Sequence, residues 1–76
     1  MQEAKVANFN NLRRLRKAQL FTVRGLSVAA GISTATIVAI ELYGDIPSAK
    51  TREKIARTLN MGEYLIWPSL EVTDGE

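Results

Sequence analysis

The chain has 76 residues, of which 46% are hydrophobic, and its net charge is +2. This length predicts one small domain, and the hydrophobic content is too high for a disordered chain. The sequence contains neither cysteine nor histidine, so we expect no disulfide, no histidine-based metal or acid–base site, no cofactor and no enzymatic activity. No apolar run reaches the roughly 20 residues of a membrane span and no segment resembles a signal peptide, which predicts a cytoplasmic protein.

The charges are unevenly distributed along the chain. Residues 1–60 contain ten basic and four acidic residues, a net charge of +6, whereas residues 61–76 contain four acidic residues and no basic one. A basic body favours a polyanionic partner through long-range attraction. The alternative is an ordinary solvated surface, since a charge of this size only suggests such a partner.

Apolar residues recur at helical spacing beyond residues 1–8, which lack a pattern and are predicted to form an N-terminal arm. The predicted helices span residues 9–19, 23–30, 34–42, 49–59 and 63–67. Residues 68–76 are acidic and are predicted to form a flexible tail. The sequence therefore predicts an all-α fold, a compact bundle of about five short helices.

Residues that favour helix ends separate these segments. Asn8 is the predicted N-cap of the first helix, and Gly31 is predicted to end the second helix with a positive φ. The predicted N-caps of the three middle helices are Thr22, Ser33 and Ser48. A turn with Pro47 precedes the fourth helix, and either Asn60 or Gly62 is expected to end it in the left-handed conformation.

The spacing of apolar residues also predicts which side of each helix faces the core. In the first helix, Phe9, Leu12 and Leu15 follow this spacing, and Phe21 is expected to plug the core after it. The apolar positions assigned to the third helix are Ile32, Ile37, Ile40 and Leu42. In the fourth helix the inward residues are Ile55, Ala56 and Leu59, and the outward ones are Lys50, Arg52, Lys54 and Arg57.

Residues 23–42 carry the strongest functional signal. Two helices joined by a tight turn containing glycine are typical of a helix-turn-helix unit, whose second helix can enter the major groove of DNA. Ser27 is small enough to let the next helix approach closely. A two-helix corner of any small bundle would show the same pattern. The flanking segments are therefore needed to distinguish a DNA-binding unit from an ordinary helix corner.

Several segments match one known family in order. They are the Arg16 position, Leu26-Ser27, Gly31-Ile32-Ser33, Ile37, Ile40-Glu41, Pro47-Ser48 and Leu59. On these residues the chain resembles the Xre-like helix-turn-helix family of Cro and phage-repressor type, with a lambda-repressor-like fold, over residues 9–67. The resemblance implies a DNA-binding transcription regulator.

The resemblance also implies an ion pair between Arg16 in the first helix and Glu41 late in the third. A carboxylate next to the inward-facing Ile40 would need a cation, and a guanidinium can meet it with two parallel hydrogen bonds. Taken singly, each residue could be an exposed surface charge. We expect the pair to form and to orient the third helix.

The family pattern assigns two sets of DNA contacts to this chain. The implied base contacts are Thr34, Ala35, Val38 and Ala39. The implied phosphate contacts are Thr22, Arg24, Ser33, Thr36, Tyr43, Ser48 and Lys50. The chain departs from the family at Val23, where glutamine is common, and at Asp45, which would repel a phosphate. With no basic or amide side chain in the base-contacting set, direct readout is expected to be weak.

Regulators of this size usually bind as two-fold dimers on near-palindromic sites. The candidate dimer residues are Tyr64, Leu65, Ile66, Trp67 and Leu70, because a small domain rarely exposes so much apolar material. Alternatively, Leu65 and Trp67 could close the core. The expected partners are double-stranded DNA and a second copy of the chain, with no membrane. The alternative function is a protein-interaction module or an antitoxin of the same fold, which would tolerate an apolar third helix.

Overall fold

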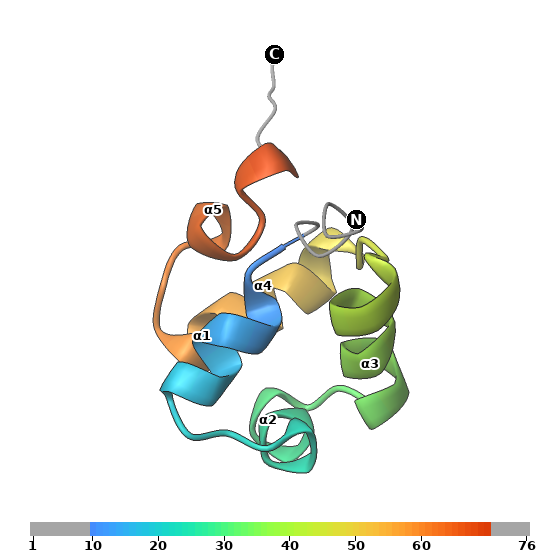
Figure 1. The fold of residues 1–76 in the computed structure, drawn as a ribbon, viewed down its shortest axis with the longest axis vertical. Helices are drawn as coiled ribbons and strands as arrows, with labels where there is room; N and C mark the ends of the chain where they lie inside the picture. Colours follow the sequence, from blue (N-terminus) through green and yellow to red (C-terminus); the bar gives the residue numbers. More distant parts are fainter. Residues whose placement is uncertain (1–9, 71–76) are drawn as a thin grey trace, which may run out of the picture.

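Five short α-helices follow one another in the computed structural model, which describes residues 10–70 (Figure 1). They are α1 (Leu12–Ala18), α2 (Val23–Ala30), α3 (Thr34–Tyr43), α4 (Ala49–Leu59) and α5 (Glu63–Ile66). A short 3-10 helix, η2 (Pro68–Leu70), follows α5, and these residues contain no strand. The predicted all-α fold is confirmed.

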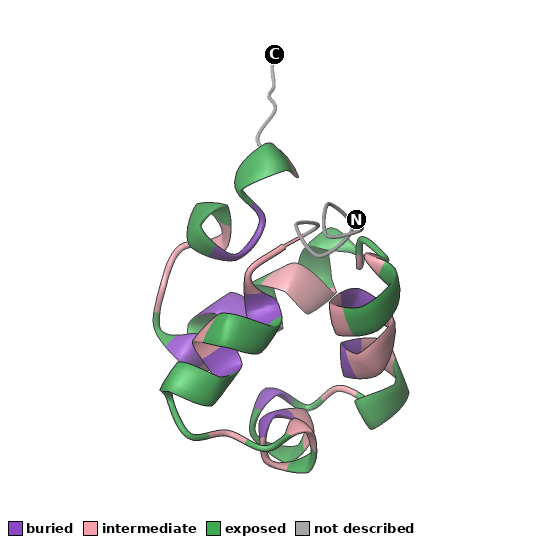
Figure 2. Ribbon diagram, in the orientation of Figure 1, coloured by how far each residue is buried: buried purple, intermediate pink, exposed green. Residues whose placement is uncertain are grey.

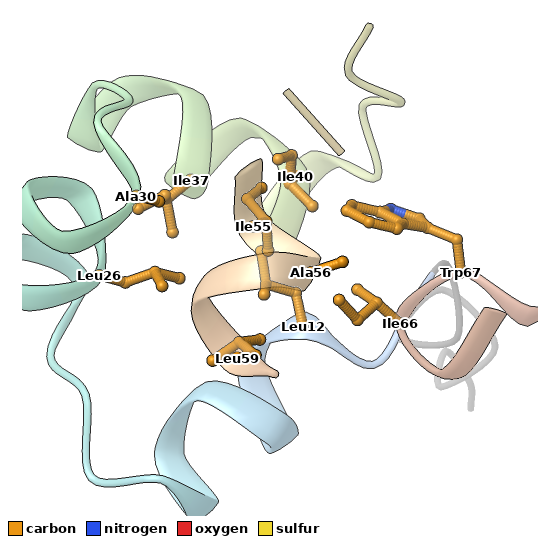
Figure 3. Packing of buried hydrophobic residues seen from close by; sticks show 10 residues of the cluster. All are labelled: Leu12, Leu26, Ala30, Ile37, Ile40, Ile55, Ala56, Leu59, Ile66 and Trp67. Atoms are coloured by element: carbon orange, nitrogen blue, oxygen red, sulfur yellow. The ribbon is translucent and has the colours of Figure 1, made fainter. Parts of the chain in front are cut away.

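The helix α4 lies at the centre of the bundle and contacts α2 on one side and α5 on the other. The helix α3 packs against both α2 and α1. In Figure 3 the side chains of α4 lie between those of Leu26, Ala30 and Ile37 on one side and those of Ile66 and Trp67 on the other, and Ile40 lies on the side of Trp67. The buried core consists of Leu12, Leu26, Ala30, Ile37, Ile40, Ile55, Ala56, Leu59, Ile66 and Trp67. All three residues predicted to face inward from α4 belong to it.

The three middle helices begin at the predicted caps. The hydroxyls of Thr22, Ser33 and Ser48 each accept a hydrogen bond from the backbone N–H three residues further on, at 2.8, 3.0 and 3.3 Å. Each bond satisfies one of the N–H groups that a helix leaves without an internal partner. Local sequence therefore sets where these helices start.

Left-handed residues end the same helices. Gly31, Gly44 and Asn60 are the C-caps of α2, α3 and α4, with φ values of 72°, 72° and 59°. Of the two candidates for the end of α4, Asn60 takes this role, whereas Gly62 is the N-cap of α5 with φ −75°. Leu20 also has a positive φ, of 64°, although it is not a glycine.

The first helix is shorter than predicted. It begins at Leu12 rather than residue 9 and ends at Ala18. The Asn10 side chain accepts a hydrogen bond from the N–H of Leu12 at 2.9 Å, and the N–H of Asn11 donates to the carbonyl of Ile66 at 2.8 Å. These bonds hold the residues before Leu12 outside the helix. The predicted cap Asn8, Phe9 and the arm over residues 1–8 lie outside the described residues.

The C-terminal end is more ordered than predicted. The last helix ends at Ile66 rather than residue 67, and the first three residues of the predicted tail form η2. The N–H of Leu70 donates to the carbonyl of Trp67 at 3.1 Å, and Pro68 suits the first position of a helix because it lacks an N–H. The remaining tail, residues 71–76, lies outside the described residues.

The proposed dimer cluster divides into two groups. Ile66 and Trp67 are buried against the core of the same chain, so they are unavailable as surface residues. Tyr64 and Leu65 are exposed and Leu70 is partly buried. The prediction is therefore wrong for Ile66 and Trp67, because α5 turns these side chains toward α4 (Figure 3).

Two further side chains point differently from the prediction. Leu42, one of the predicted apolar positions of the third helix, is exposed, because it lies two residues after the buried Ile40 and so on the opposite side of the helix. Arg52 was assigned to the outward face but is half-buried. Its Nε lies 3.0 Å from a carboxylate oxygen of Glu63, and it also donates to the carbonyl of Pro47 at 2.9 Å.

Candidate nucleic-acid interface

The turn between α2 and α3 is built from hydrogen bonds around Ser27. The N–H groups of Gly31 and Ile32 donate to the Ser27 carbonyl at 2.9 and 3.1 Å. The Ser27 hydroxyl in turn donates to the carbonyl of Ile32. The left-handed conformation of Gly31 lets the chain reverse within these few residues. The geometry fixes the angle at which α3 leaves α2.

The helix α3 is anchored along one side only. Ile37 and Ile40 are buried in the core. On the other side, Thr34 and Ala35 are exposed. The remaining two candidate base-contacting residues, Val38 and Ala39, are partly exposed. Figure 2 shows the buried residues of α3 on the side facing the bundle and the exposed ones on the side facing away. All four candidate side chains thus lie on the solvent side of α3.

The candidate phosphate-contacting residues also lie at the surface. Those exposed are Thr22, Arg24, Ser33, Tyr43, Ser48 and Lys50, and Thr36 is partly exposed. The Ser33 and Thr36 hydroxyls lie 2.9 Å apart and hydrogen-bond each other. The hydroxyls of Thr22, Ser33 and Ser48 already act in helix caps, so only a spare donor or lone pair on each is left for a ligand.

Helix N-termini add a positive potential to this surface. None of α2, α3 and α4 has an acidic residue in its first turn. No carboxylate in the first turn therefore neutralises the partial positive charge of these N-termini, and helix N-termini bind phosphate oxygens through their free N–H groups. Asp45 is the last acidic residue before the start of α4 in the sequence, and it is exposed.

The ion pair between Arg16 and Glu41 is present and ties α1 to α3. Arg16 Nε and Nη2 donate to the two carboxylate oxygens of Glu41 at 2.7 and 3.0 Å, and Nη1 donates to the carbonyl of Phe21 at 2.7 Å. The two side chains are only 7% and 4% exposed. The hydrogen bond to Glu41 raises the pKa of Arg16, against the opposing effect of burial. The guanidinium therefore stays charged, and the pair orients the outer face of α3.

Two hydrogen bonds from amide side chains to helix C-termini were not predicted from the sequence. The Asn10 amide donates to the carbonyl of Ile40 at 3.0 Å, and the Gln19 amide donates to the carbonyl of Leu59 at 2.8 Å. Both carbonyls belong to the last turn of a helix, where no partner exists within the helix. The amide side chains were visible in the sequence, but their partners lie 30 and 40 residues away. No local pattern indicates such a pairing.

The family model for helix-turn-helix proteins matches residues 12–65. The chain therefore belongs to the Xre-like, lambda-repressor-like helix-turn-helix family, a family of DNA-binding transcription regulators generally without enzymatic activity. No curated protein matches the chain significantly. Within residues 10–70, no helix is both long and apolar enough to cross a membrane.

Proposed function

We propose that the protein is a transcription regulator that places α3 in the major groove of DNA. Thr34, Ala35, Val38 and Ala39 would then contact base edges. The Thr34 hydroxyl can donate or accept one hydrogen bond, while the three apolar side chains can contact thymine methyl groups. Such a surface favours A·T-rich sites and reads sequence weakly.

The observation that carries the proposal is the one-sided anchoring of α3. Ile37 and Ile40 hold the helix in the core, and the buried pair of Arg16 and Glu41 fixes its rotation. The side chains that the family uses at bases are left on the solvent side. A recognition helix has to be rigid and have one free face, and α3 meets both conditions.

Phosphate contacts would flank α3 on the duplex. Thr22 and Arg24 lie at the start of α2, Ser33 and Thr36 at the start of α3, and Ser48 and Lys50 at the start of α4. Tyr43 adds an exposed hydroxyl at the end of α3. Backbone contacts of this kind position a protein on DNA, while base contacts specify the sequence.

A two-fold dimer would place two copies of α3 about 34 Å apart, one helical turn of DNA, on a near-palindromic site. The surface residues available for it at the C-terminal end are Tyr64, Leu65 and Leu70. Doubling the interface in this way compensates for the weak base contacts of each subunit.

Selection from a random pool of duplexes, at low and at moderate salt, tests the proposal. We expect an enriched A·T-rich near-palindrome and an affinity that falls steeply with salt. Ala35→Asp should abolish enrichment because it places a carboxylate on the outer face of α3. Ala18→Asp makes the same charge change at an exposed position of α1 and serves as the control. Absence of any enrichment by the parent protein would contradict the proposal.

A second candidate function is a protein-interaction module. The observation that favours it is the small and apolar set of side chains at Ala35, Val38 and Ala39, which can pack against another protein. Binding through an apolar interface would not weaken steeply with salt, which separates the two functions.

A further inference from the structure

The outer face of α3 is apolar from Ala35 to Leu42. Ala35, Val38, Ala39 and Leu42 recur at the spacing of one helix face, opposite the buried Ile37 and Ile40. Leu42 is 54% exposed, and the neighbouring Tyr43 is 72% exposed. A helix that is apolar on all sides is normally covered on all sides. The outer face therefore favours contact with another apolar surface.

This face is complementary to a second copy of itself. When two copies of α3 lie antiparallel about a two-fold axis, Ala35 of each lies opposite Leu42 of the other, and Val38 lies opposite Ala39. Thr34 then lies opposite Tyr43. In each of these pairs a smaller side chain meets a larger one, which is how helix faces interlock. The face carries no charged residue that an identical copy would repel.

The charges at the two ends of α3 favour the same arrangement. The helix has no acidic residue in its first turn and no basic residue in its last turn. Its positive N-terminus and negative C-terminus are therefore both uncompensated. In an antiparallel pair each end lies beside the opposite end of the other helix. We propose that the protein associates with a second copy of itself through the outer faces of α3.

The association should be weak. A helix of 10 residues is about 15 Å long. One such face is smaller than the roughly 800 Å² per partner of a stable interface. The dimer should therefore form only at high protein concentration. It would cover the side chains of α3 that face DNA in the proposed function, so self-association and DNA binding should compete. Only this competition rests on the proposed function.

Sedimentation velocity from micromolar to millimolar concentration tests the self-association. The parent should shift from monomer to dimer, and Leu42→Lys should weaken the association constant about tenfold or more, because it buries a charge. Val28→Lys is the matched control, since Val28 is an exposed apolar residue of α2, at 75%, outside both proposed interfaces. It should not change the association. Leu65→Lys tests the C-terminal residues as the alternative interface, and it should leave the α3 association unchanged. Circular dichroism and thermal unfolding establish that all three variants fold.

Three results would overturn the inference. They are a parent that stays monomeric at millimolar concentration, a Leu42→Lys variant that associates like the parent, and loss of association in Leu65→Lys instead. The last result would assign the interface to the C-terminal residues.

Titration with the selected duplex, or with a random duplex at low salt if none is enriched, tests the competition. DNA should dissociate the parent dimer, and Leu42→Lys should bind DNA at least as tightly as the parent. A ternary complex in which the α3-mediated dimer persists on DNA would refute the competition. Failure of the parent to bind any DNA would refute the proposed function, while the sedimentation result would still decide the self-association.

Discussion

Replacing Glu41 with alanine tests whether the buried ion pair holds α3 in place. The substitution would leave the Arg16 guanidinium in a site where its side chain is 7% exposed, with the carbonyl of Phe21 as its partner. Removing one partner of a buried pair costs about 3–5 kcal/mol, mostly because the other charge stays buried without compensation. A domain of this size has a total stability of about 5–15 kcal/mol. Glu41→Ala should therefore remove a large part of the stability.

Urea denaturation and thermal unfolding followed by circular dichroism measure this loss. At about 4–8 °C per kcal/mol for a domain of this length, the melting temperature should fall by at least about 12 °C. The matched control is Glu53→Ala, which breaks the pair with Arg57 on the exposed side of α4. Exposed pairs contribute about 0.5 kcal/mol, so the control should stay close to the parent.

A double variant separates the cost of an uncompensated buried charge from the cost of lost side-chain volume at the site. Arg16→Met combined with Glu41→Leu removes both charges and keeps most of the volume. It should lose less stability than Glu41→Ala, although more atoms are changed. If Glu41→Ala differs from the parent by less than about 0.5 kcal/mol, the pair does not hold α3 and the reasoning is refuted.

Three further predictions concern the caps, the backbone and the phosphate contacts. Leu20→Gly should stabilise the protein by about 1 kcal/mol in urea denaturation, because Leu20 has a positive φ while its side chain is 91% exposed; destabilisation would show that the leucine side chain contributes packing. Ser48→Ala should cost about 1 kcal/mol by the same assay, since it removes the N-cap of α4, and Ser48→Gly should cost only a few tenths; equal losses would contradict a capping role. Lys50→Ala should reduce the slope of the logarithm of the DNA-binding constant against the logarithm of salt concentration by the share of about one phosphate contact, whereas Lys17→Ala on α1 should leave this slope unchanged. Equal slopes for the two variants would show that Lys50 does not contact DNA.

The sequence alone was sufficient to place the three middle helices. Thr22, Ser33 and Ser48 begin them, and Gly31 ends α2, as the structure shows. These signals could be read because a cap satisfies N–H groups only three residues away. The sequence also allowed the ion pair between Arg16 and Glu41 to be predicted, but only through the resemblance to a family.

The tertiary structure decided which apolar side chains are covered. Tyr64 and Leu65 are exposed while the next residues, Ile66 and Trp67, are buried. A helix of four residues shows no periodicity from which its buried side could be read. The exposure of Leu42 could not be predicted for a related reason, since α3 is apolar on both sides and its composition does not indicate which side faces the core.

The start of α1 also depended on distant parts of the chain. The Asn10 side chain donates a hydrogen bond to the carbonyl of Ile40. Asn11 donates through its side chain to the carbonyl of Leu65 and through its backbone N–H to the carbonyl of Ile66. Hydrogen bonds between residues 30 or more positions apart exist only after the helices have packed. Local sequence therefore determined the ends of the middle helices, while packing between the helices determined the first turn of α1 and the residues left at the surface.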